Sequence, residues 1–194
     1  MRQPVRNLTI ENIDSITQAF TQELATIGGS IVGKSGIPLM LALKRDRLGH
    51  GPYPDVSLFE AANRIMSDLV ILHGIAALLK NKHFPFDEYI VEFGNENRRA
   101  FDIQAFSPIG SLAGEAFNAA PSYFNNKKNS ALKKLQTKAA NEHYRIIMFN
   151  AEAPGKTITP DVGGAFQIAV DIATGTVDIT PPTAGLMDRV TEQS

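Results

Sequence analysis

Two carboxylates stand close together in the middle of the sequence, in segments that alternate like β-strands. Asp102 lies in RRAFDIQAF, and Glu115 lies thirteen positions later in GSLAGEAFNAA. The alternation of apolar and polar residues predicts a strand for each segment, joined by the turn SPIG. Two carboxylates with a backbone carbonyl are enough protein ligands for Mg²⁺, which keeps several waters. Because Mg²⁺ activates water and relieves charge on a leaving oxygen, this spacing suits hydrolysis of a phosphodiester.

Helical patterns precede and follow the two strands. The segment from Ser57 to Lys80 has apolar residues at helical spacing, and Ser57 with Glu60 forms a capping-box pattern at its start. The strand-like EYIVEF follows it, and after Pro121 the stretch SYFNNKKNSALKKLQTKAANEH predicts a second helix. The buried pattern YRIIMFNAE then predicts a last strand. The order helix, three-stranded meander, helix, strand predicts an α/β fold whose last strand joins the sheet through a helical crossover.

The element order and the two acidic residues together resemble the PD-(D/E)XK nuclease superfamily, which includes many type II restriction endonucleases. The resemblance covers about half the chain, from the helix with Glu60 to the strand ending near Phe149. It implies a restriction-endonuclease-like core, with a central mixed β-sheet flanked by helices. It also implies that Asp102 and Glu115 are catalytic ligands of Mg²⁺. Glu60 would match the acidic residue that many members carry on the preceding helix, where it helps to hold a second metal or its water.

The expected lysine of the motif is missing from its usual place. It should stand two residues after Glu115, where this sequence has Phe117, and no proline precedes Asp102. Some members of the superfamily carry the lysine on the following helix, which makes Lys127 or Lys128 the catalytic candidate. The alternative is a chain that has lost catalysis and keeps the nuclease fold as a DNA- or protein-binding module.

Basic residues near the carboxylates favour double-stranded DNA as the substrate. The candidate DNA contacts are Arg98, Arg99, Lys133 and Lys134. A second basic cluster, Lys44, Arg45 and Arg47, is either a solvated helix end or a contact with DNA phosphates near the active face. Because cutting both strands of a duplex is simplest with two symmetric active sites, we expect a homodimer. These features predict a type II restriction endonuclease.

A nucleotide-binding loop is an alternative for the glycine-rich stretch GGSIVGKSG. Gly28, Gly33, Lys34 and Ser35 match the pattern GxxxxGK[ST] letter for letter. That loop works when a buried strand feeds it and a helix leaves it. The preceding segment has apolar residues at steps of three and four and predicts an amphipathic helix, and Pro38 follows closely. A glycine-rich connection is therefore the favoured interpretation.

Length and composition predict one soluble domain over residues 1–194. We divide it into an N-terminal helical part (1–56), the nuclease-like core (about 57–150) and an added C-terminal β-hairpin (160–194), indicated by GAFQIAVDIATGTVDITPP. The chain has no cysteine, which excludes thiolate nucleophiles and cysteine-ligated zinc. Its four histidines are scattered, and its net charge of −1 gives no overall attraction to nucleic acid. The start resembles no signal peptide and the longest apolar run is too short to span a bilayer, so we expect a cytoplasmic protein without a membrane partner.

Overall fold

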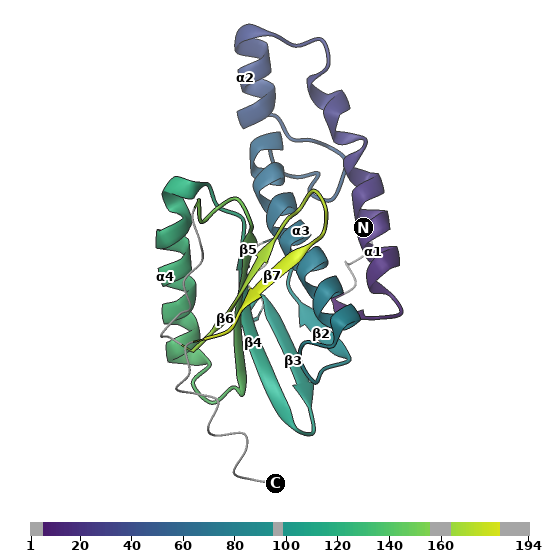
Figure 1. The fold of residues 1–194 in the computed structure, drawn as a ribbon. Helices are drawn as coiled ribbons and strands as arrows, with labels where there is room; N and C mark the ends of the chain where they lie inside the picture. Colours follow the sequence, from purple (N-terminus) through teal and green to yellow (C-terminus); the bar gives the residue numbers. More distant parts are fainter. Residues whose placement is uncertain (1–5, 95–98, 156–163, 183–194) are drawn as a thin grey trace.

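The computed structural model describes residues 6–94, 99–155 and 164–182, whose strands form one seven-stranded mixed sheet (Figure 1). The strands lie in the sheet in the order of the sequence. The first four, β1 (Asn7–Thr9), β2 (Glu88–Val91), β3 (Ile103–Ser107) and β4 (Gly110–Phe117), are antiparallel neighbours. The last three are β5 (Tyr144–Asn150), β6 (Phe166–Val170) and β7 (Val177–Thr180). Since β4, β5 and β6 run parallel and β7 returns antiparallel, the predicted α/β class and the C-terminal hairpin are both confirmed.

Helices cover both faces of the sheet. The helices α1 (Ile13–Leu24) and α3 (Leu58–Asn81) lie on one face, and α4 (Pro121–Lys138) lies on the other (Figure 1). A 3₁₀ helix, η1 (Ile27–Ile31), and α2 (Gly36–Lys44) extend beyond the N-terminal end of α3. The crossover from β4 to β5 through α4 is the one that the element order predicts.

The helix α3 begins where the sequence predicts, because the Ser57 side chain accepts a hydrogen bond from the Glu60 backbone N–H. Its buried side, which includes Val70, Leu72 and Ile75, packs on the central strands. By length and composition alone α3 could cross a membrane. More than half of its most apolar stretch is buried against the rest of the protein, as expected of a core helix.

The helix α4 starts with Pro121 in its first turn, where a missing backbone N–H costs nothing. Its apolar stripe faces an aromatic layer of the sheet, in which Phe117 and Phe149 lie 5.9 Å apart between ring centroids and Phe124 meets Phe149 at 4.9 Å. The stripe consists of Phe124, Ala131, Leu132 and Leu135. Every second residue of β4 therefore points toward α4, including Glu115 between Ala113 and Phe117.

Two N-terminal features differ from the sequence interpretation. The three-residue strand β1, which pairs with β2, was not expected. Pro38 does not break α2, because it lies in the first turn of that helix. The segment before Lys34 is helical, as predicted, so the glycine-rich stretch lacks the strand that a phosphate-binding loop requires.

We expect Gly114→Ala to lower the free energy of unfolding by about 1–3 kcal/mol, since overpacking a close-packed core is costly. A Cβ at this position would lie 2.5 Å from Ile146 Cγ1 and 3.1 Å from Ile103 Cβ, inside the sheet. Gly28→Ala is the control, because nothing lies within 4 Å of a Cβ there. Urea unfolding of both variants measures the difference; equal stability of the two would contradict this packing.

Candidate active site

A cavity of about 390 Å³ opens at one end of the sheet, between the N-terminal halves of α3 and α4. Its walls come from α3, the chain leaving β2, the chain around Asp102 that enters β3, the end of β4 with the connection that follows it, and α4. The charged side chains that line it are Asp68, Glu92, Arg99, Asp102, Lys127 and Lys134. Glu115 does not itself line the cavity; it is buried on β4, where Lys134, which does line the cavity, contacts its carboxylate. Both predicted carboxylates therefore belong to one site.

Backbone hydrogen bonds hold Asp102 in place just before β3. Its carboxylate Oδ2 accepts a hydrogen bond from the Ala116 N–H at 2.9 Å, across the β3–β4 pair. Its carbonyl oxygen accepts another from the Glu92 N–H at 2.9 Å. Asp102 is thus fixed between β2 and β4, with its side chain directed at the end of β4 that carries Glu115.

A lysine does reach Glu115, and it comes from α4. Lys134 Nζ donates to Glu115 Oε2 at 2.8 Å and lies 2.6 Å from Oε1. The same ammonium group lies 5.8 Å from the ring centroid of the buried Phe101. Lys134, which the sequence placed among the possible DNA contacts, is therefore the cation next to the buried glutamate.

Asp68 of α3 is a third acidic group at the cavity, and it is almost fully buried. Tyr53 donates its hydroxyl hydrogen to Asp68 Oδ2, and the Gly94 N–H donates to Oδ1 at 3.0 Å. Burial raises the pKa of Asp68 to about 7, although both hydrogen bonds and the charge of Arg64 lower it. The charge of Asp102 contributes to the increase, which shows that the two carboxylates interact.

The two carboxylates predicted from the sequence also have raised pKa values. Burial, and then the negative charge of Asp102, raises the pKa of Glu115 to about 7 against the opposing effect of Lys134. Burial raises the pKa of Asp102, while the Ala116 N–H, Lys134 and Lys127 lower it and Glu92 raises it. Burial is the largest cause of each increase, and carboxyl groups with raised pKa values gathered at one cavity are typical of a functional site.

The donor atoms suit a hard divalent cation. Glu115 Oε1 is buried and accepts no hydrogen bond, and the Lys134 ammonium group at 2.6 Å is the cation beside it. Within the described residues no group of three acidic or histidine side chains is arranged to hold a metal by itself. A cation bound here would rest on Asp102, Glu115, a backbone carbonyl and water, which is the mixed oxygen set that Mg²⁺ accepts.

Several residues predicted for the site lie elsewhere. Glu60 is exposed and forms an ion pair with Arg64 in the first turns of α3, about two turns before Asp68. Its backbone N–H belongs to the helix cap at Ser57. Lys128 donates to Gln167 Oε1 on β6 at 2.6 Å, since one residue along a helix turns a side chain by about 100°. Neither residue lines the cavity.

Of the remaining predicted residues, which lie on α4 and after β2, some line the cavity and others do not. Lys127 is exposed and lines the cavity, and its charge lowers the pKa of Asp102. Arg99 also lines the cavity, and its N–H donates to Glu92 Oε2 at 2.8 Å. Lys133 is exposed and does not line the cavity. Arg98 lies outside the described residues.

Sequence reasoning missed Asp68 and did not predict that Lys134 pairs with Glu115. A signal for Asp68 was present, because it is a lone acid at the start of the apolar run DLVIL, where a buried carboxylate needs a partner. Lys127 and Lys134 are seven residues apart, so they share one face of α4, whereas Lys128 does not. Spacing along the helix could thus have separated the three lysines.

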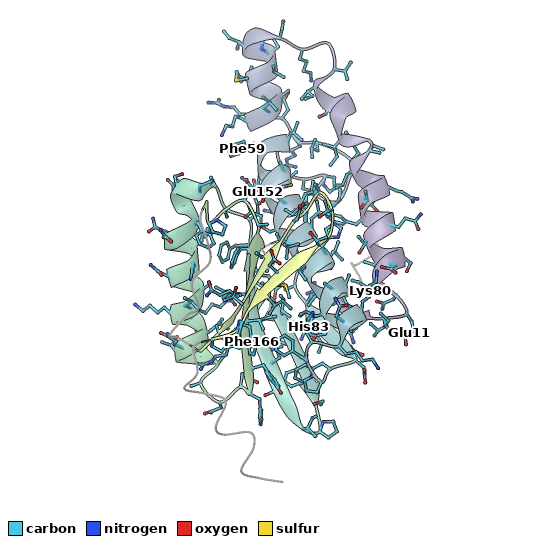
Figure 2. The ribbon with its side chains drawn as sticks, viewed as in Figure 1. Glu11, Phe59, Lys80, His83, Glu152 and Phe166 are labelled. Atoms are coloured by element: carbon cyan, nitrogen blue, oxygen red, sulfur yellow. The ribbon has the colours of Figure 1, made fainter. Side chains whose placement is uncertain are left out.

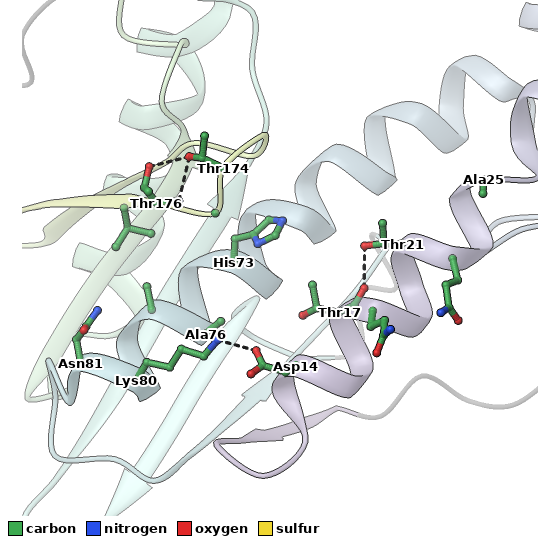
Figure 3. A pocket seen from close by; sticks show the side chains of 15 residues that line it. Asp14, Thr17, Thr21, Ala25, His73, Ala76, Lys80, Asn81, Thr174 and Thr176 are labelled. Atoms are coloured by element: carbon green, nitrogen blue, oxygen red, sulfur yellow. Dashed lines mark hydrogen bonds and ion pairs between the residues drawn. The ribbon is translucent and has the colours of Figure 1, made fainter.

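A larger groove, of about 1000 Å³, lies between α1, α3 and the β6–β7 turn (Figure 3). Its walls are mainly small and polar side chains such as Thr17 and Thr174, with an exposed ion pair between Lys80 Nζ and Asp14 Oδ1 at 2.7 Å. His73 lies there, with its pKa lowered by burial. The groove has no cluster of buried carboxylates, so the smaller cavity is the candidate active site.

No protein-family model matches this sequence, and no curated protein matches it. The candidate site therefore rests on the geometry described above.

We expect the free energy of unfolding to fall as the pH rises from about 4 to about 7. Asp68 and Glu115 have raised pKa values in the folded chain, so the folded state binds their protons more tightly than the unfolded state and loses stability as they ionise. Asp68→Asn and Glu115→Gln should each flatten this dependence, by on the order of 1–2 kcal/mol across the range. Denaturant unfolding at a series of pH values measures it.

Glu60→Gln is the matched control, because it removes an exposed carboxylate from the same helix as Asp68. Its pH profile should follow that of the unchanged protein. Profiles of all three variants that coincide with the unchanged protein would show that the buried carboxyls do not titrate in this range.

Proposed function

We propose that the protein is a magnesium-dependent endonuclease of the PD-(D/E)XK superfamily that cleaves double-stranded DNA. The observation that carries this proposal is the ion pair between Lys134 and Glu115 beside Asp102. The three residue types of the motif are then together at one site, with the lysine supplied by α4 instead of β4. The order from α3 through the three strands and α4 to β5 supports a restriction-endonuclease-like core.

Each residue at the site has a role in this proposal. Asp102 and Glu115 bind Mg²⁺ through their carboxylate oxygens. When bound, the ion supplies Lewis-acid stabilisation of the phosphate and lowers the pKa of water. Lys134, at 2.6–2.8 Å from both oxygens of Glu115, orients the attacking water and stabilises charge on the phosphate. Asp68 takes the place on the preceding helix that Glu60 was expected to fill.

Lys127 and Arg99 give the site its contacts with a phosphate backbone. Both line the cavity, and Lys127 is exposed on the same face of α4 as Lys134. Cations at the mouth hold the strand and carry no base preference, so sequence recognition needs other side chains. In the full proposal the protein is a cytoplasmic type II restriction endonuclease that acts as a homodimer, with one site for each strand.

A second function is favoured by a different observation. Phe117 occupies the usual lysine position and is a core residue of the aromatic layer beneath α4. If the Lys134–Glu115 pair only neutralises a buried acid, the chain is an inactive nuclease-fold module that binds DNA or protein. The distinction depends on Lys134, because that residue has a role in catalysis only in the first function.

We expect Lys134→Met and Glu115→Ala to reduce magnesium-dependent cleavage of supercoiled plasmid by about 10²–10³-fold or more, the usual cost of removing a group that stabilises the transition state. Lys133→Ala is the control, since Lys133 is the exposed neighbour outside the cavity. Lys127→Ala should weaken substrate binding and raise KM more than it lowers kcat, because Lys127 lies at the mouth. Single-turnover cleavage separates these effects.

The inactive module predicts a different set of results. The unchanged protein would cleave no DNA at any magnesium concentration, and Lys134→Met would lose stability without losing any activity. Cleavage that survives Lys134→Met at full rate would also contradict the catalytic assignment, because the lysine would then have no role.

We expect isothermal titration calorimetry to detect binding of Mg²⁺ or Mn²⁺ that is stronger at pH 8 than at pH 6. The raised pKa values of Asp102 and Glu115 mean that protons compete with the metal at the lower pH, and binding should release protons. Asp102→Asn should abolish binding, while Glu60→Gln should leave it unchanged, because Glu60 lies outside the cavity. Equal loss of metal binding in Asp102→Asn and Glu60→Gln would show that the metal binds at another site.

A further inference from the structure

The helix α2 exposes an apolar surface that packing among the described residues does not explain. Its sequence is GIPLMLALK, yet only Ala42 is buried. Ile37 is 75% exposed and Met40 is 53% exposed, one turn apart on the helix, and Val32 before it is 78% exposed. Together with the adjoining chain, residues 32–47 form what we call the α2 arm. Exposed apolar surface of this kind marks a site of interaction.

Basic residues surround this surface. The charged residues of the α2 arm are Lys34, Lys44, Arg45, Asp46 and Arg47, four cations against one carboxylate. Lys44 Nζ lies 3.2 Å from the ring centroid of Phe59, which is itself 52% exposed at the start of α3 (Figure 2). This cation–π contact keeps a positive charge next to the apolar edge. The α2 arm therefore suits a partner that is negatively charged and has some apolar surface.

A second copy of the chain fits these charges poorly. An antiparallel pair of α2 helices would bring Lys34 near the start of one helix toward Lys44 and Arg45 at the end of the other. Like charges facing each other across an apolar contact are unfavourable. An anionic partner instead gains from all four cations.

The place of the α2 arm points to nucleic acid among anionic partners. The arm packs on the N-terminal end of α3, and the α3 residues Asn63 and Ser67, which follow Phe59 within about two turns, line the carboxylate cavity. In Figure 1, α2 lies beyond α3 at the end of the molecule where α4 begins. A duplex whose phosphate sits at the cavity mouth would extend toward the arm.

We propose that the α2 arm is a DNA-binding element that holds the duplex on one side of the cavity, an inference that rests on the proposed nuclease function. Lys44, Arg45 and Arg47 contact phosphates, and the edge formed by Ile37 and Met40 lies in a groove against sugar and base edges. Apolar side chains flanked by basic residues bind DNA in this way, with the cations supplying most of the affinity.

The test is fluorescence anisotropy with a labelled duplex, with Ca²⁺ in place of Mg²⁺ to prevent cleavage. The triple variant Lys44→Ala/Arg45→Ala/Arg47→Ala should weaken binding about tenfold or more and lower the slope of log K against log salt by about 2–3. The double variant Ile37→Ser/Met40→Ser should weaken binding several-fold with the slope unchanged. Lys82→Asn, at the far end of α3, is the control and should bind like the unchanged protein. Thermal unfolding checks that all variants fold.

The alternatives give separate results. DNA affinity unchanged in both the triple and the double variants overturns the inference, and if the unchanged protein still cleaves DNA, the nuclease proposal stands. DNA binding through the α2 arm without magnesium-dependent cleavage supports the inference and refutes the nuclease. Three further results each overturn the inference: no DNA binding by the unchanged protein, binding to phosphatidylserine vesicles in place of DNA, or a dimer that Ile37→Ser/Met40→Ser dissociates with DNA affinity intact.

Discussion

The parallel pairing of β4 with β5 is the constraint on which the site depends. Parallel neighbours cannot be joined by a hairpin, so the chain must leave β4, cross one face of the sheet as α4 and return to enter β5. That crossover carries Lys134 back over the strand that holds Glu115. Asn150 at the end of β5 fixes the start of the crossover, because its Oδ1 accepts the Ala119 N–H at 2.9 Å and its Nδ2 donates to the Ala119 carbonyl. The topology therefore brings lysine and glutamate together, although they are far apart in the sequence.

The same arrangement has an electrostatic cost. Burial disfavours the charged forms of Asp68, Asp102 and Glu115, and the charge of Asp102 also raises the pKa of both Asp68 and Glu115. Lys134 and backbone N–H groups offset only part of this effect. A chain selected for stability alone would replace such residues with apolar ones, since a buried ionic group seldom stabilises a fold. The surrounding packing, including the fully buried aromatic Phe149, provides the stability that tolerates them.

Local patterns allowed part of this site to be predicted. Alternation along two short strands was enough to bring Asp102 and Glu115 together, because a meander places neighbouring strands side by side. The partner of Glu115 could not be predicted in this way, since it depends on how α4 is rotated above the sheet. Asp68 was missed because a helix with apolar residues on most sides gives no clear buried face. The strand β1 is three residues long, too short to show an alternating pattern, and it pairs with β2.

Phe117 and Lys134 are best understood together. Phe117 and Glu115 lie on the same face of β4, beneath the apolar stripe of α4. The Phe117 ring packs there against Phe124 and Phe149. A lysine at position 117 would remove this aromatic packing, although position 117 also lines the cavity. The long side chain of Lys134 on α4 instead reaches Glu115 and lines the cavity. Lys134 thus places a cation beside the glutamate, while Phe117 keeps the core beneath α4 apolar.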